Sequence, residues 1–222
     1  MNKTAKDIFK NSLSAAIGLI FFALGVYFTI QANIGVSPWD TFELGLASTL
    51  GITYGTASII VSIIIILIDV LMHEKIGIGM FLDAFLVGKS VDLFNYLNLI
   101  PMQDNIVISL ILMVLGLFLM GFSQFFYMRA GLGCGPRDTL LVGMARRMIK
   151  IPIGAVSIAL LAVVTFFGWL LGGPIGIGTL ICAFCVGPSM QLSFKIVHFK
   201  PTTVEHQDII TSAKIIFNKK HG

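Results

Sequence analysis

Two short polar turns, which stand between long apolar segments, hold the residue types best suited to bind a ligand. The first reads IGVSPWDT and the second reads GLGCGPRDTL. Backbone N–H groups at a helix start attract anions, and glycines let those groups approach a ligand closely. An arginine can pair with a carboxylate or phosphate, and a tryptophan can stack on a ring. The candidate substrate-binding residues are therefore Trp39, Asp40, Gly133, Gly135, Arg137 and Asp138.

A second interpretation gives these residues a structural role. Ser37 precedes a proline and stands three residues before Asp40, as in a capping box at a helix start. Gly135 takes the position of the serine in the second turn. Both aspartates would then cap short helices and complement their dipoles. Arg137 would serve as a cytoplasmic anchor or as the partner of Asp138.

Three charged residues lie within an apolar segment further along the chain: Asp83, Lys89 and Asp92. Ionisable groups inside a membrane segment are candidates for coupling to a proton or an ion. Lys89 and Asp92 are three residues apart and can also pair on one helical face. The alternative is therefore an ion pair that holds the helices together.

The elements that position these residues are membrane helices. Hydrophobic residues make up 56% of the chain, charged residues only 12%, and the mean hydropathy is +0.94; soluble domains carry about 25% charged residues. Apolar segments long enough to span a bilayer are predicted at about 11–32, 53–72, 76–98, 105–128, 152–171 and 174–197. Two shorter helices are predicted at about 38–49 and 136–149.

The chain is thus predicted to be an all-α, polytopic helix bundle with six transmembrane helices. Residues 1–199 form a single membrane domain, and residues 200–222 form a cytoplasmic tail, either as a helix on the membrane surface or as a loose segment. Placing both termini in the cytoplasm puts fourteen of the fifteen Lys and Arg on the inner side, which supports this orientation. They are Lys3, Lys6, Lys10, Lys75, Arg129, Arg137, Arg146, Arg147, Lys150, Lys195, Lys200, Lys214, Lys219 and Lys220.

An internal repeat organises the membrane domain. The pattern Pro-x-Asp-Thr-x-x-x-Gly-x-Ala begins at Pro38 and recurs 98 residues later at Pro136. Small-residue pairs, which allow close helix packing, recur with an offset of 99. The corresponding residues are Gly55 and Gly154, Ser58 and Ser157, Ala84 and Ala183, and Gly88 and Gly187.

Two repeats, about 11–100 and 105–199, therefore each contain three spans and one short helix, which is re-entrant or interfacial. Because three is odd, the second repeat enters the membrane from the opposite side. Inverted repeats of this kind build many secondary transporters. The expected solute is small and organic, either anionic or aromatic, and its transport is coupled to protons or an ion.

The two repeated turns and the paired IGIG…AF.VG stretches resemble the YczE/YyaS/YitT-like group of bacterial integral membrane proteins, closest to its YczE-type branch. The resemblance covers about residues 11–198. It implies a multi-pass protein of the bacterial cytoplasmic membrane, and it supplies no substrate.

Two other functions remain open: the substrate-binding membrane subunit of an energy-coupled importer, and a non-transporting scaffold or assembly protein. No enzymatic activity is expected, because an aspartyl protease needs two carboxylates that share a proton, whereas the two turns enter from opposite faces. No cofactor or metal site is expected. The expected partners are the lipid bilayer and an unidentified small molecule, with a homodimer as an option and no nucleic acid.

Overall fold

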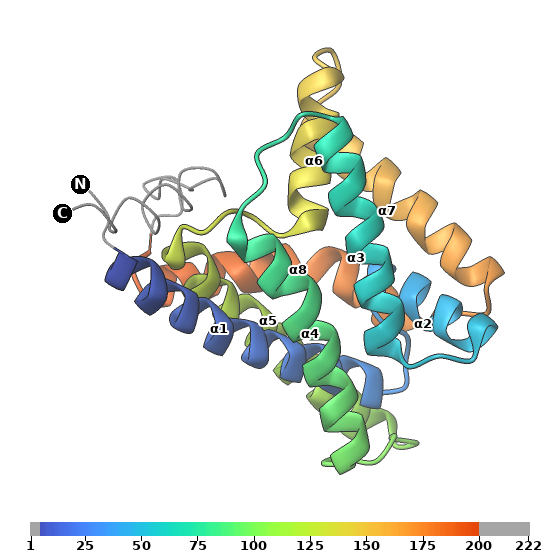
Figure 1. The fold of residues 1–222 in the computed structure, drawn as a ribbon. Helices are drawn as coiled ribbons and strands as arrows, with labels where there is room; N and C mark the ends of the chain where they lie inside the picture. The colour runs from blue at the N-terminus through green and yellow to red at the C-terminus, as the bar shows by residue number, and fades with distance from the viewer. Residues whose placement is uncertain (1–4, 200–222) are drawn as a thin grey trace.

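The computed structural model describes residues 5–199, which form helices and connecting loops without strands. Figure 1 colours the helices along the chain. They are α1 (Ala5–Gln31), α2 (Pro38–Leu50), α3 (Tyr54–Leu71), α4 (Ile78–Leu97), α5 (Ile106–Ala130), α6 (Pro136–Arg147), α7 (Ile153–Leu170) and α8 (Ile177–Ile196). The all-α prediction is confirmed, with six long helices and two short ones. The predicted tail, residues 200–222, lies outside the described residues.

Five of the helices within residues 5–199 are long and apolar enough to cross a membrane: α1, α3, α5, α7 and α8. The expected sixth span, α4, has 20 residues but includes Asp83, Lys89 and Asp92. Its charge content therefore sets it apart from the other five. The short helices α2 and α6 have 13 and 12 residues. At about 1.5 Å per residue they are shorter than the roughly 30 Å hydrocarbon core of a bilayer.

The centre of the bundle is the pair α1 and α5, which cross where both helices have glycine. A Cβ atom placed on Gly25 would lie 2.7 Å from the carbonyl oxygen of Gly116, and one placed on Gly116 would lie 2.7 Å from that of Gly25. Only glycine permits so close an approach of two helix backbones. Around this pair, α1 packs against α4 and α5 packs against α8. The same arrangement thus occurs once in each half of the chain.

The loops that follow α1 and α5 dock onto the opposite half. The N–H of Gly79, at the start of α4, donates a hydrogen bond to Leu132 O at 2.9 Å, and the N–H of Gly178, at the start of α8, donates to Ile34 O at 2.7 Å. Gly133 in the second loop has a φ of +107°, a conformation that side chains other than glycine rarely adopt. Each polar turn is therefore held by the beginning of a long helix from the other repeat.

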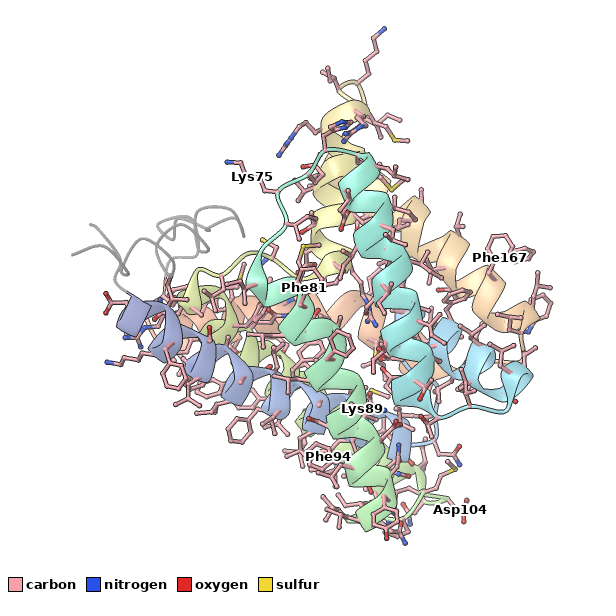
Figure 2. The ribbon with its side chains drawn as sticks, viewed as in Figure 1. Lys75, Phe81, Lys89, Phe94, Asp104 and Phe167 are labelled. Carbon is pink, nitrogen blue, oxygen red and sulfur yellow. The ribbon has the colours of Figure 1, made fainter. Side chains whose placement is uncertain are left out.

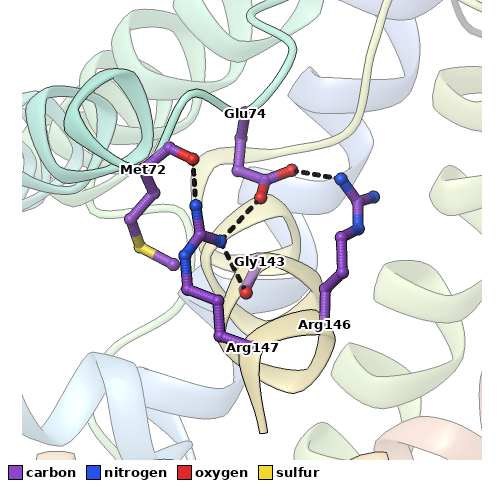
Figure 3. A network of polar contacts seen from close by, with 5 residues as sticks. All are labelled: Met72, Glu74, Gly143, Arg146 and Arg147. Atoms are coloured by element: carbon purple, nitrogen blue, oxygen red, sulfur yellow. Dashed lines mark hydrogen bonds and ion pairs between the residues drawn. The ribbon is translucent and has the colours of Figure 1, made fainter. Parts of the chain in front are cut away.

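The short helix α6 is anchored at its C-terminal end to the end of α3. Arg147 donates to Glu74 Oε1 at 2.9 Å, to Gly143 O at 2.8 Å and to Met72 O, while Arg146 donates to Glu74 Oε2 at 3.1 Å (Figure 3). Glu74 is nearly buried although both arginines are exposed. This network fixes the end of α6 that lies away from its polar turn.

The other short helix, α2, has an equivalent anchor on α7. Thr49 Oγ1 donates to Gly45 O at 2.9 Å within α2 and to Leu171 O at 3.2 Å beyond the end of α7. Thr49 is equivalent to Arg147 in the repeat, and its two contacts with backbone oxygens correspond to those of Arg147 with Gly143 O and Met72 O. The remaining surface of α7 is apolar and exposed, and Phe167 points away from the bundle (Figure 2). Such a face is typical of a helix that contacts lipid.

Candidate functional site

The first polar turn begins α2, and its aspartate is fully engaged. Ser37 Oγ accepts a hydrogen bond from the N–H of Asp40 at 3.3 Å and donates one to Asp40 Oδ2 at 2.6 Å. The hydroxyl of Tyr54, at the start of α3, donates to Asp40 Oδ1 at 2.7 Å. Asp40 is 1% exposed. Ser37 therefore caps α2, and Asp40 holds the hydroxyl of this cap and joins α2 to α3.

The second polar turn begins α6, and its aspartate lacks these contacts. The N-cap residue Gly135 has no side chain to offer, and within residues 5–199 Asp138 neither accepts a hydrogen bond nor forms an ion pair. The repeat relates Ser37 to Gly135 and Tyr54 to Ile153. Both partners of the first aspartate have thus been replaced by residues that cannot donate a side-chain hydrogen bond to the second.

Arg137 connects the two short helices. Its guanidinium forms an ion pair with Glu43 of α2 and lies 5.3 Å from the centre of the Trp39 ring, in cation–π geometry. The side chain of Glu43 is completely buried. The direct ion-pair partner of Arg137 is therefore Glu43 and not Asp138.

Sequence reasoning missed Glu43, because it assigned this residue to an outside loop. One signal was available: Glu43 stands four residues after Trp39, so the two side chains share a face of α2. Nothing in the sequence pointed that face toward α6.

A polar cavity of about 100 Å³ lies between the two halves of the chain. Its walls come from α1, α3 and α4 of the first half, and from α5, α6 and the loop between them in the second. Four predicted site residues line it: Asp83, Gly135, Arg137 and Asp138. The other predicted residues lie outside its lining: Trp39, Asp40, Lys89, Asp92 and Gly133.

The carboxylates of Asp83 and Asp138 approach each other beside Gly135. A Cβ atom placed on this glycine would lie 3.0 Å from Asp83 Oδ2 and 3.9 Å from Asp138 Oδ2. Over the described range, neither carboxylate has a hydrogen-bond or ion-pair partner. Two acidic groups from different repeats therefore face the same cavity without a direct hydrogen-bond or ion-pair partner within residues 5–199.

Several neutral hydroxyl groups complete the lining and were not predicted as site residues. Ser58 and Ser62 of α3 are almost fully buried, and their hydroxyls have no hydrogen-bond partner among residues 5–199. Tyr127 of α5 is 5% exposed, and its buried hydroxyl also lacks a partner there. Buried polar groups are normally hydrogen-bonded. These three side chains are therefore available to a bound molecule.

Lys89 and Asp92 do not form the ion pair that their spacing allows. Asp92 Oδ1 accepts from the N–H of Gly55 at 2.8 Å, and its Oδ2 accepts from Thr53 Oγ1 at 2.7 Å. Lys89 is exposed on α4 (Figure 2), and no ion pair involves it within the described part of the chain. Asp92 thus fastens α4 to the beginning of α3. Any coupling role for Lys89 or Asp92 remains a prediction.

A family model described as a family of unknown function, DUF6198, matches residues 9–195. The chain belongs to this family. The chain is similar to the uncharacterized membrane protein YczE of Bacillus subtilis. The two sequences are 34% identical over 178 residues, which cover 79% of this chain and 81% of the relative. The predicted resemblance is thereby confirmed, and the chain is a membrane protein.

Two further relatives have lower identities. The uncharacterized protein YyaS of Bacillus subtilis is 29% identical over 188 residues, which cover 82% of this chain and 92% of the relative. An uncharacterized protein of Haemophilus influenzae is 26% identical over 186 residues, which cover 82% and 84%. No solved structure matches the chain.

Proposed function

We propose that the protein is a secondary transporter that moves a small organic solute across the bacterial cytoplasmic membrane by alternating access. In this proposal α1, α3 and α4 form one three-span repeat, and α5, α7 and α8 form the other in inverted orientation. Both termini lie in the cytoplasm, as the distribution of Lys and Arg favours. Transporters built in this way bind substrate near the midplane, where the repeats meet. The cavity between the two halves has the corresponding position.

The helix α4 serves as the sixth span. Its 20 residues correspond to about 30 Å, which matches a hydrocarbon core. Asp83 faces the cavity, and Asp92 faces the start of α3, so neither carboxylate faces lipid. Lys89 has a long stem that can extend its ammonium toward the membrane surface. Charged residues arranged in this way are compatible with a membrane span.

The short helices serve as re-entrant elements. In the proposed topology α2 starts from the outer side and α6 from the inner side. Their first turns nevertheless meet, because Arg137 contacts both Glu43 and Trp39. Two short helices that start on opposite sides can meet only if both fold back into the bundle. Their backbone groups are then covered by protein, as irregular membrane segments require.

A difference between equivalent glycine pairs carries the proposal of alternating access. In the first repeat Gly55 packs on Gly88, so that a Cβ on Gly88 would lie 3.1 Å from the Cα of Gly55. In the second repeat a Cβ on Gly154 or on Gly187 would meet no atom within 4 Å. The four glycines are equivalent by the repeat, yet close packing between them occurs in the first repeat and not in the second.

This difference describes one of two related states. The first repeat is closed between α3 and α4, while the second is open between α7 and α8. If the repeats exchange these conformations, Gly154 packs on Gly187 and the contact between Gly55 and Gly88 opens. The cavity then becomes accessible from the other side of the membrane, which is the essential step of alternating access.

Uptake by the purified protein in liposomes tests the proposal. We expect saturable uptake of a small organic solute, driven by a proton or sodium gradient without ATP or another subunit. Gly187→Trp should abolish this flux, since it fills the space into which α7 must close. Leu192→Trp, at an exposed position of the same helix, is the matched control and should retain flux.

The result also separates the alternatives. Tight solute binding without flux would favour a substrate-binding subunit of an energy-coupled importer. Neither binding nor flux would favour a membrane scaffold. Either result would contradict the proposed transport activity.

A further inference from the structure

We infer that the cavity between the repeats binds a small organic ammonium cation that donates N–H hydrogen bonds to Asp83 and Asp138. This inference rests on the proposed function, because it names the chemical class of the solute that the proposed transporter carries. It replaces the anionic solute that Arg137 and the helix-start amides suggested.

The positive charge of Arg137 is not available to a ligand. Its guanidinium is bound by the buried carboxylate of Glu43 and covered on one side by the ring of Trp39. An anion in the cavity would have to compete with an ion pair that is already formed. It would also approach the two unpaired carboxylates of Asp83 and Asp138, which would repel it.

The two carboxylates of the cavity, in contrast, have no direct partner in the described part of the chain, and Arg137 acts on them only through its field. Both carboxylates lie beside Gly135 and lack a hydrogen-bond or ion-pair partner among residues 5–199. The N-terminus of α6 offsets part of this charge, since a helix dipole supplies about half a unit charge. Arg137 offsets another part, but it is already paired with Glu43, so an excess of negative charge remains in the cavity. A cation placed between Asp83 and Asp138 reduces their mutual repulsion.

Comparison of the two repeats supports a ligand role for Asp138. Its equivalent, Asp40, is satisfied by the hydroxyls of Ser37 and Tyr54. At the corresponding positions Asp138 has Gly135 and Ile153, which offer no side-chain donor. The second repeat therefore retains the acidic group and lacks its internal partners, so the carboxylate is free to accept hydrogen bonds from a solute.

The neutral lining favours an ammonium group with several N–H donors. The hydroxyls of Ser58, Ser62 and Tyr127 have no partner in the described part of the chain and can accept hydrogen bonds. A primary ammonium has three donors and can reach two carboxylates and one hydroxyl together. A quaternary ammonium carries the same charge but has no donor. Phe22 supplies an apolar surface for a short alkyl chain.

The test is direct binding of radiolabelled ethylammonium to the purified full-length protein. We expect saturable binding that unlabelled ethylammonium displaces and that acetate and tetramethylammonium do not. Asp83→Asn and Asp138→Asn should each weaken binding by about tenfold or more, because each removes a charged hydrogen-bond acceptor. Asp104→Asn changes a carboxylate in the loop between α4 and α5, outside the cavity, and should leave binding unchanged.

Size-exclusion profiles and thermal melting establish that each variant is folded, and the two cavity variants test the inference independently. Absence of saturable ethylammonium binding would overturn the inference, as would equal displacement by sodium or by acetate. Unchanged binding in both cavity variants would also overturn it. Liposome flux distinguishes the two proposals. If an anion is transported and ammonium does not bind, only the inference of a cationic solute is refuted. If ammonium binds and no solute is transported, only the proposed transport function is refuted.

Discussion

The two hydrogen bonds that Asp92 makes to the start of α3 should control the balance between the two states proposed above. Opening α3 from α4 breaks the bonds from Thr53 and from the N–H of Gly55. When the repeats exchange conformations, close glycine packing is lost in the first repeat and formed in the second. The packing contribution to the free-energy difference between the two states therefore nearly cancels. The hydrogen bonds do not cancel, because the residue equivalent to Asp92 is the neutral Gln191.

The expected shift can be estimated from these bonds. A hydrogen bond to a charged group contributes about 1.5–3 kcal/mol, and a neutral one contributes about 1 kcal/mol. Asp92 is partly exposed, so solvent weakens both of its bonds. Together the two bonds therefore stabilise the observed state by about 2 kcal/mol, all of which is lost when the carboxylate is removed. Asp92→Ala should therefore raise the population of the opposite state about 30-fold.

Disulfide cross-linking can measure this population. Cysteines at positions 154 and 187 are tolerated in the observed state, where both glycines have open space around them. They come within disulfide range only when α7 closes on α8. The native Cys134, Cys182 and Cys185 are first replaced by serine or alanine. If exchange is fast, Asp92→Ala should increase the rate of intramolecular cross-linking about 30-fold.

Asp104→Ala, in the loop between α4 and α5, is the control and should leave the cross-linking rate unchanged. A folded Asp92→Ala variant that cross-links no faster would refute the reasoning. Cross-links that join two chains would refute it too, because they would make Gly154 and Gly187 part of an interface between copies.

Three further substitutions test the packing around the site. Arg137→Gln should destabilise the protein by about 3–5 kcal/mol, because it leaves the buried Glu43 without its ion-pair partner; adding Glu43→Gln should restore part of that loss in thermal melting. Gly133→Ala should reduce the yield of folded protein, since φ is +107° and the loop packs tightly against α4. Arg147→Ala should lower stability by only about 1 kcal/mol, because the contact with Glu74 is partly solvated and salt-sensitive. Melting curves at low and high salt would contradict this last prediction if the loss were large and independent of salt.

Much of the helical framework could be predicted because its determinants are local. Long apolar segments and helix starts such as Ser37 lie in continuous stretches of sequence, so their identity follows from hydropathy and capping chemistry. The internal repeat predicts that the two turns enter the membrane from opposite faces, and this stays a prediction. The contact between their first turns through Arg137 is a result of the structure.

The partners of the charged residues could not be predicted, because they are set by tertiary contacts. Arg137 and Glu43 are 94 residues apart, and no repeat relates them. Helical spacing made Lys89 a natural partner for Asp92. The carboxylate instead accepts from Thr53 and Gly55, where it also satisfies an amide at the start of α3 that has no partner within its own helix. Local spacing identifies which pairs can form, and the competing long-range contact decides which pair does form.

A duplicated chain offers an internal control for interpreting its own motifs. Asp40 and Asp138 occupy the same place in the same turn, yet one is fully hydrogen-bonded and the other has no hydrogen-bond or ion-pair partner in residues 5–199. The shared motif therefore accounts for a helix start in both copies. By itself it does not indicate a ligand-binding site in either copy. What distinguishes the copies is the loss of a serine and a tyrosine around the second aspartate, and the gain of Asp83 where the other repeat has Cys182. Substrate recognition is expected where equivalent backbone positions of the two repeats carry a charged side chain whose hydrogen-bond partners are present in one repeat and missing in the other. The cavity lined by Asp83 and Asp138 is such a place.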